Sequence, residues 1–226
     1  GECTRVVPIR IIEEPNIDGV GTHANPYKIS TAEELLKVVG LINSGVSVYD
    51  KICYKITAPI ILNENLLDRI AHNDTEGLVK WTPIKNFSGE FMGSYFNRIR
   101  GLYIKDEQAM FVENYGTISS LYLEDCFVEG NAAICYENHG SIENCGLLSS
   151  KVVGRNGVAG VCCYNYGNML QILNWSDIEG RNDVAGICSY NKGIISFARN
   201  DANVTASFQA AGGVVSQNTG QLEHCT

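Results

Sequence analysis

The sequence contains little proline, no long apolar run and no cluster of basic charge. Proline accounts for 5 of the 226 residues against 23 glycines, which favours a packed, turn-rich domain over a disordered chain. No apolar stretch approaches the roughly 20 residues that span a bilayer, so we expect no membrane span in this chain. The formal net charge is −8 without a run of Lys or Arg, and we therefore expect no nucleic-acid partner.

The motifs of common catalytic and metal centres are also missing. Neither His72 nor His139 begins the His-Glu-x-x-His of zinc peptidases, and no Cys-x-x-Cys, His-x-x-x-His, Gly-x-Ser-x-Gly or phosphate-binding loop occurs. We therefore expect a protein that is not an enzyme, with no catalytic residue, no cofactor and no metal. Residues 1–22 lack the charged-then-apolar order of a signal peptide, and Cys3 is a candidate lipid-anchor cysteine near a mature N-terminus.

The most informative feature that is present is a repeat built on Asn-x-Gly. Its glycines stand 24, 27, 26 and 27 residues apart, and its asparagines are Asn114, Asn138, Asn165, Asn191 and Asn218. Other positions keep the same phase. Three residues before each asparagine stand Phe111, Cys135, Cys162, Cys188 and Val215, and two residues after each glycine stand Ile118, Ile142, Met169, Ile195 and Leu222.

Each repeat offers short apolar segments separated by turn residues, and none is long enough for a helix. Such a unit buries its apolar side only by stacking on its neighbours. We therefore predict an all-β fold, a right-handed parallel β-helix with coils about 4.8 Å apart. A leucine-rich-repeat horseshoe is excluded because the Leu-x-x-Leu-x-Leu signature is absent.

Before the repeats, the sequence predicts one capping α-helix over about residues 31–43. Ser30 and Glu33 form a capping box, four apolar residues make one stripe, and Gly45 ends the helix. We expect this helix to cover the first coil, and residues 63–80 to form an irregular insertion loop. The predicted organisation is a leader or linker over 1–20 and a single β-helix domain over 21–226, with repeats over about 105–226.

Residues 21–35, followed in order by 81–84, 87–91 and 99–104, resemble the conserved blocks of bacterial GLUG-repeat proteins. Such repeats also occur beside immunoglobulin A1-specific metallopeptidase domains and in adhesin-like surface proteins. The copies here are degenerate, because the Gly-Leu-x-Gly core becomes Ala-Gly-Val-Cys at 159–162 and Ala-Gly-Ile-Cys at 185–188. The resemblance implies a β-helix and an extracellular or cell-surface location.

Two sets of residues are candidates for a role at the surface of the coils. The asparagine column is predicted to be a structural ladder that satisfies turn backbone, the alternative being a binding ladder. The candidate ligand face consists of the tyrosines around that turn, which offer contact area with a polar group, the alternative being that they pack over the turns. These tyrosines are Tyr115, Tyr136, Tyr164, Tyr166 and Tyr190.

Cysteines and carboxylates leave two further alternatives open. Cys135, Cys162 and Cys188 share one column, where buried reduced thiols are favoured over a disulfide between adjacent coils. Polysaccharide-active β-helices use groups of acids on one face. The acids at recurring positions here are Glu113, Glu137, Asp125, Asp177 and Asp201.

These observations predict a non-catalytic bacterial surface or secreted module, used for adhesion or as a stalk. Its expected partner is a host glycan or a surface protein. Two alternatives stay open: a polysaccharide-active β-helix enzyme, and an accessory domain of a larger surface protease. The chain ends within a coil, which suggests truncation or a cap from another chain.

Overall fold

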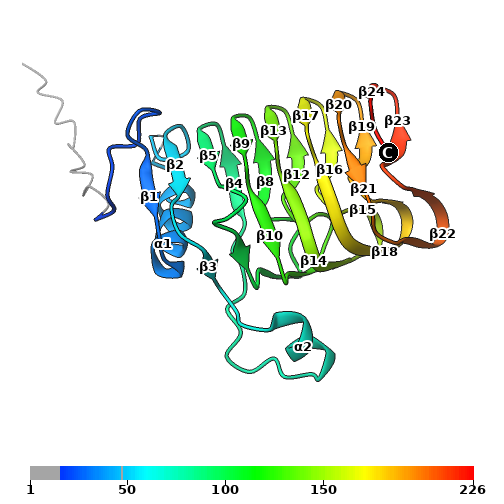
Figure 1. The fold of residues 1–226 in the computed structure, drawn as a ribbon, viewed down its shortest axis with the longest axis horizontal. Coiled ribbons are helices and arrows are strands. Elements are labelled where there is room, and N and C mark those ends of the chain that lie inside the picture. Colours follow the sequence, from blue (N-terminus) through cyan, green and yellow to red (C-terminus); the bar gives the residue numbers. More distant parts are fainter. Residues whose placement is uncertain (1–15, 47) are drawn as a thin grey trace, which may run out of the picture.

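The structure is a computed structural model that describes residues 16–46 and 48–226. Cys3 and most of the expected 1–20 linker therefore lie outside the described residues. The chain winds into a parallel β-solenoid whose coils follow one another from the N-terminal helix to the last strands (Figure 1). This confirms the predicted all-β parallel fold.

Three parallel sheets run along the solenoid. The first contains β1 (Tyr27–Ile29), β2 (Cys53–Ile56), β5 (Glu90–Met92), β9 (Thr117–Ser119), β13 (Ser141–Glu143), β17 (Asn168–Leu170), β20 (Ile194–Ser196) and β24 (Gln221–Glu223). The second contains β4 (Ile84–Phe87), β8 (Phe111–Asn114), β12 (Cys135–Asn138), β16 (Cys162–Asn165), β19 (Cys188–Asn191) and β23 (Val215–Asn218). Each Asn-x-Gly turn therefore joins a strand of the second sheet to a strand of the first.

The third sheet completes each coil. It contains β3 (Ile60–Ile61), β6 (Ile99–Arg100), β7 (Tyr103–Lys105), β10 (Tyr122–Glu124), β11 (Phe127–Glu129), β14 (Gly146–Val153), β15 (Asn156–Ala159), β18 (Leu173–Ala185), β21 (Arg199–Asn200) and β22 (Val204–Gly212). The long strands β14 and β18 contain register shifts. In each of these coils one long strand takes the place of two short ones, since β14 pairs with both β10 and β11 of the preceding coil.

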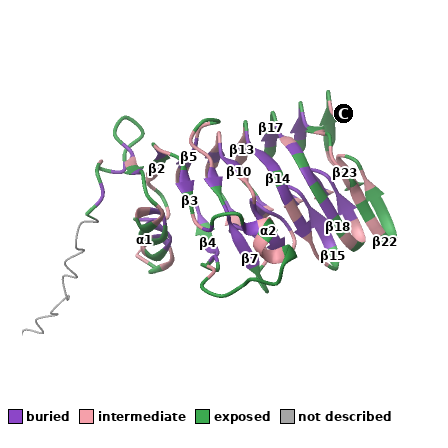
Figure 2. Ribbon diagram, turned by 60° about the horizontal axis from the view of Figure 1, so that its bottom comes forward, coloured by how far each residue is buried: buried purple, intermediate pink, exposed green. Residues whose placement is uncertain are grey.

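The repeat columns of the sequence are columns of the core. Ile118, Ile142, Met169 and Ile195 pair in register from coil to coil and are fully or almost fully buried. Buried residues of this kind form one continuous core through the solenoid (Figure 2). Burial on this scale is the principal stabilising term of the fold.

The glycines of the Asn-x-Gly turns are required by close backbone packing. A Cβ added at Gly140, Gly167 or Gly193 would lie 2.0–2.1 Å from the carbonyl oxygen of the glycine one coil earlier. No side chain can occupy that space. The glycine column therefore sets how closely the coils stack at this corner.

Helix α1 (Ala32–Asn43) closes the N-terminal end of the core (Figure 1). Its buried side chains Leu35, Val38, Val39 and Ile42 belong to the solenoid core. The predicted capping box is wrong by one residue, because the N-cap is Thr31 and its partner is Glu34. Ser30 stays outside the helix, and its backbone N–H donates to Glu34 Oε2 at 2.7 Å.

The projecting segment over 63–80 is not irregular throughout, because it contains the six-residue helix α2 (Leu66–Ala71) (Figure 1). Asn63 closes its neck, accepting from the N–H of Val79 at 2.8 Å and donating to the carbonyl of Gly101 at 2.8 Å. Asp125, on another coil, caps the N-terminus of α2 in place of a local cap. Neither helix of the described residues is long and apolar enough to cross a bilayer.

Candidate functional site: the aromatic column at the asparagine turn

The asparagine ladder fixes the turn on which the candidate site stands. Each Nδ2 of Asn114, Asn138, Asn165 and Asn191 donates to Oδ1 of the next asparagine at 2.8 Å. The first four side chains are buried, and Asn218 at the end is exposed. Because each amide also donates to backbone carbonyls of its turn, the ladder holds successive turns in one conformation.

The residue between Asn and Gly forms a second column, which is exposed. The Tyr115 and His139 rings stack at 4.8 Å with planes 7° apart, and the His139 and Tyr166 rings stack at 4.8 Å with planes 4° apart. Lys192 places its Nζ 5.3 Å from the centre of the Tyr166 ring. Tyr115 is 52% exposed and Tyr166 is 40% exposed. We call these four residues the aromatic column.

The other three tyrosines of the predicted face lie elsewhere and are half-buried. Tyr164 and Tyr190 stack at 4.7 Å, and Tyr136 meets Tyr164 edge-on at 5.4 Å. All three pack against a small buried cluster of Ala109, Ala132 and Cys163 outside the main core. The predicted face is therefore two surfaces, and only Tyr115 and Tyr166 belong to the exposed one.

The environment of the half-buried tyrosines Tyr164 and Tyr190 raises the pKa of their hydroxyls. Burial raises the pKa of Tyr164 to about 12. Burial and a 2.7 Å hydrogen bond to Asp183 raise the pKa of Tyr190 well above its usual value. The Tyr190 hydroxyl is therefore engaged within the fold, and it is less available to a ligand than the exposed hydroxyl groups.

Two carboxylates flank the aromatic column. Glu113 and Glu137 are register partners on β8 and β12. Glu113 accepts from the Tyr115 hydroxyl at 2.9 Å, which raises the pKa of that tyrosine, and Glu137 lies 3.6 Å from His139 Nε2. The surface thus combines a row of stacked rings, two carboxylates beside its first two rings, and the Lys192 ammonium beside Tyr166.

The remaining candidate acids are dispersed and have partners. Asp125 accepts from the backbone N–H groups of Leu66 and Leu67 at 2.9 and 3.1 Å. Asp201 pairs with Arg199 at 2.7 Å and accepts from Trp175 Nε1 at 2.8 Å. Asp177 accepts from Asn203. Since these acids engage protein groups in different places, they do not converge with Glu113 and Glu137.

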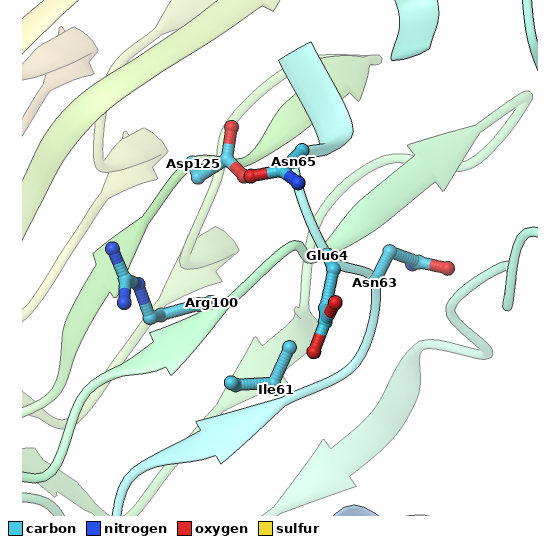
Figure 3. Close-up of a pocket in the computed structure, with 6 residues that line it drawn as sticks. All are labelled: Ile61, Asn63, Glu64, Asn65, Arg100 and Asp125. Carbon is cyan, nitrogen blue, oxygen red and sulfur yellow. The ribbon is translucent and has the colours of Figure 1, made fainter. Parts of the chain in front are cut away.

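A cavity of about 220 Å³ lies where the projecting segment meets the solenoid (Figure 3). Its polar walls come from Asn63, Glu64, Asn65, Arg100 and Asp125. Asn63 and Asp125 are committed to the neck and the helix cap, and Arg100 pairs with Glu124 at 3.0 Å. Among these polar residues, only the side chains of Glu64 and Asn65 are not engaged in such contacts. The cavity therefore lies mainly between side chains that hold the projecting segment against the solenoid.

The cysteine column lies inside the core. Cys135, Cys162 and Cys188 are register partners, fully buried and unbridged. Each thiol donates to the carbonyl two residues later, at 3.2 to 3.4 Å. Burial raises the pKa of Cys162 and Cys188 well above the usual range, so these groups behave as small apolar side chains.

Sequence reasoning missed three features of these surfaces. Two of them are His139 and Lys192, which belong to the aromatic column. Each is the middle residue of an Asn-x-Gly motif, so a comparison of the middle residues of the repeats would have found them. The third feature is a cluster of His23, Cys53 and Glu90, whose ligand atoms lie within 4.8 Å of one another. Its members stand up to 67 residues apart, so no short spacing motif announced it.

No protein-family model matches the sequence, and no curated protein is similar to it. Among solved structures, the chain is similar to the crystal structure of a "putative immunoglobulin A1 protease" from Bacteroides ovatus. The TM-score is 0.69 and the sequence identity is 14%, over 89% of this chain and 65% of that one. The chain thus spans less than two thirds of that structure. The likeness shows the shared fold alone, and the resemblance to GLUG-repeat proteins stays a prediction.

Proposed function

We propose that this chain is a non-catalytic module of an exported bacterial surface protein and that it binds glycan through the aromatic column. The observation that carries the proposal is the exposure of three stacked rings in a straight row on one corner of the solenoid. Packing against the fold explains the position of half-buried tyrosines such as Tyr190, but it does not explain why the rings of Tyr115 and Tyr166 are exposed to solvent.

The chemistry of the row suits a polymer of hydroxylated rings. Because the three rings stack face to face, they present their edges and polar atoms to solvent, and those polar groups donate and accept hydrogen bonds. The rings recur at the spacing of the coils, and Glu113, Glu137 and Lys192 stand beside them for hydroxyl, amine or carboxylate groups of a sugar. A linear glycan laid along the solenoid axis would meet the same elements repeatedly.

The surface location rests on two likenesses. The GLUG-like blocks of the sequence are typical of bacterial surface proteins, and the solenoid fold is shared with the structure described as a "putative immunoglobulin A1 protease". The chain would serve as a binding or accessory part of such a larger protein.

The test is a glycan array printed beside host mucins and matrix proteins, probed with the labelled chain and with the Tyr115→Ala/Tyr166→Ala variant. The matched control is Phe197→Ala, which removes another exposed ring, 54% exposed and stacked on His224 at 4.8 Å. We expect glycan signals that vanish in the double variant and persist in the control. Signals on proteins alone, or no signal, would overturn the glycan assignment.

A polysaccharide-active enzyme is the second candidate, and one observation favours it. Glu113 and Glu137 stand on adjacent coils beside the column, and paired carboxylates of this kind hydrolyse glycosidic bonds when about 5–10 Å apart. Incubation with the glycans that bind, followed by analysis of reducing ends, decides between the two functions. Cleavage that is lost in Glu113→Gln and Glu137→Gln would replace the binding module with a hydrolase.

A further inference from the structure

The turn that precedes β1 brings one histidine against two strands of the solenoid. Cys53 on β2 and Glu90 on β5 are register partners, so their side chains stand side by side on adjacent coils. The backbone N–H of Cys53 donates to the carbonyl of Gly21 at 2.9 Å and anchors the turn that carries His23. Gly21 has a φ of +74°, a conformation that favours glycine.

The same turn is held by its own hydrogen bonds. The N–H groups of Val20 and Thr22 both donate to the carbonyl of Asn25, at 3.1 and 3.3 Å, and the N–H of Asn25 donates back to Thr22. The position of His23 is therefore set by backbone contacts that are independent of its imidazole. A site assembled in this way is preorganised.

Two of the three ligand atoms are spaced as a tetrahedral metal requires, and the third lies within 4.8 Å of both. Cys53 Sγ lies 3.5 Å from Glu90 Oε2, and His23 Nδ1 lies 2.6 Å from the same oxygen. Zinc bonds of about 2.3 Å to sulfur and 2.0–2.1 Å to nitrogen and oxygen imply separations of about 3.5 Å for S···O and 3.3 Å for N···O. The thiol and carboxylate already meet this spacing. His23 Nδ1 lies closer to Glu90 Oε2 than zinc requires and within 4.8 Å of Cys53 Sγ, so metal binding requires the exposed imidazole to shift.

We propose that His23, Cys53 and Glu90 form a zinc-binding site with one open coordination position. A thiol beside an imidazole selects zinc over the oxygen-preferring magnesium and calcium ions. Three protein ligands leave the fourth position of a tetrahedral zinc for water or for a ligand donor. Of the three ligands, His23 is exposed and borders an open cavity of about 430 Å³. Lys55 lines the same cavity and favours an anionic donor there. Lys28 also lines it, but its Nζ pairs with Asp18 Oδ2 at 2.7 Å.

The ion would join the turn before β1 to the second and third strands of the first sheet. The site therefore ties the N-terminal segment to the solenoid, and it is separate from the aromatic column, whose function does not depend on it. The sequences of β2 and β5 contain no short metal-binding motif. Cys53 and Glu90 are brought together by the register between adjacent coils, which a spacing motif does not reveal.

The test is titration of the metal-free 226-residue chain with Co²⁺ and then with Zn²⁺, under reducing conditions. We expect one equivalent of Co²⁺ to produce the near-ultraviolet charge-transfer absorption of a thiolate bond, and Zn²⁺ to displace it. Cys53→Ser should abolish the absorption. Glu90→Gln keeps the size of the side chain but removes the carboxylate. Loss of a residue that only hydrogen-bonds to a metal ligand weakens metal binding roughly 10–100-fold, so loss of a direct ligand should weaken Zn²⁺ binding at least as much.

Two control variants separate this site from adventitious binding. Cys225→Ser removes the other half-exposed described thiol, and His72→Ala removes an exposed histidine, so both should bind Co²⁺ as the unmodified chain does. Absence of the charge-transfer absorption, or its persistence in Cys53→Ser with an unchanged circular dichroism spectrum, would overturn the proposal. Unchanged Zn²⁺ affinity in Glu90→Gln would remove Glu90 from the ligand set and refute the three-residue site.

Discussion

The strongest energetic prediction concerns the centre of the asparagine ladder. Asn165 is fully buried, donates to Asn191 Oδ1 at 2.8 Å and accepts from Asn138 Nδ2 at 2.8 Å. Asn165→Ala removes both ladder bonds, together with the longer bonds of the amide to the carbonyls of Gly167 and Ile194, and interrupts the ladder at its middle. Water has no access to the vacated place, since the neighbouring amides are buried as well.

The magnitude follows from the groups that lose partners. Asn191 Oδ1 becomes a buried acceptor without its donor, at about 1–3 kcal/mol. The smaller side chain leaves a cavity worth about 1 kcal/mol. Asn138 Nδ2 loses its shortest bond but keeps the carbonyls of Gly140 and Asn168, both at 3.3 Å. We therefore expect the free energy of unfolding to fall by about 2–4 kcal/mol.

Asn218 provides the matched control, because it occupies the same column at an exposed end. Water can replace its bond to Asn191, so Asn218→Ala should cost less than about 1 kcal/mol. The assay is urea unfolding followed by circular dichroism, with midpoint and slope compared between variants, because solenoids need not unfold in one step. Equal losses in the two variants would refute the argument that burial makes the ladder stabilising.

Three further predictions use the same unfolding assay or a direct probe of one element. Gly167→Ala should lower the free energy of unfolding by more than about 3 kcal/mol or prevent folding, because the added Cβ would lie 2.1 Å from a backbone oxygen. The control is Gly40→Ala in α1, where the added Cβ meets nothing within 4 Å. This variant should be neutral or stabilising by up to about 1 kcal/mol. Asp125→Ala should cost about 1 kcal/mol of local stability at α2, seen as faster amide exchange after Leu66, with the coils unchanged. Burial raises the pKa of the Cys126 thiol to about 12, from the value near 9 of an exposed cysteine. Its contribution to stability is therefore present below about pH 9 and is lost as the pH rises toward 12, and unfolding free energies that stay level across that window would contradict this.

The phase of the repeat was enough to predict the coils. Because parallel strands pair residue by residue, a column that recurs in sequence becomes a column in space, as Cys135, Cys162 and Cys188 illustrate. The same reasoning placed the asparagines in one line. The fold class and the main core therefore follow from apolar residues and glycines at fixed intervals.

Other features depend on contacts that the repeat does not encode. Two overlapping capping boxes fit the sequence. The extended N-cap conformation falls at Thr31, whose side chain accepts from the N–H of Glu34, while Ser30 also donates to the Glu34 carboxylate. Helix α2 is capped by Asp125 from 58–59 residues away, so local patterns could not reveal its start. The tyrosines divide into two surfaces because a second small core forms under Tyr136, Tyr164 and Tyr190.

The central claim is that the aromatic column is the binding surface, and one titration tests it most directly. The affinity of the strongest array glycan would be measured calorimetrically for the unmodified chain, for Tyr166→Ala and for Phe197→Ala. We predict a loss of about tenfold or more in Tyr166→Ala, the factor that corresponds to 1.4 kcal/mol, with no change in Phe197→Ala. Equal affinities in all three proteins would contradict the account and leave the column without a role in recognition.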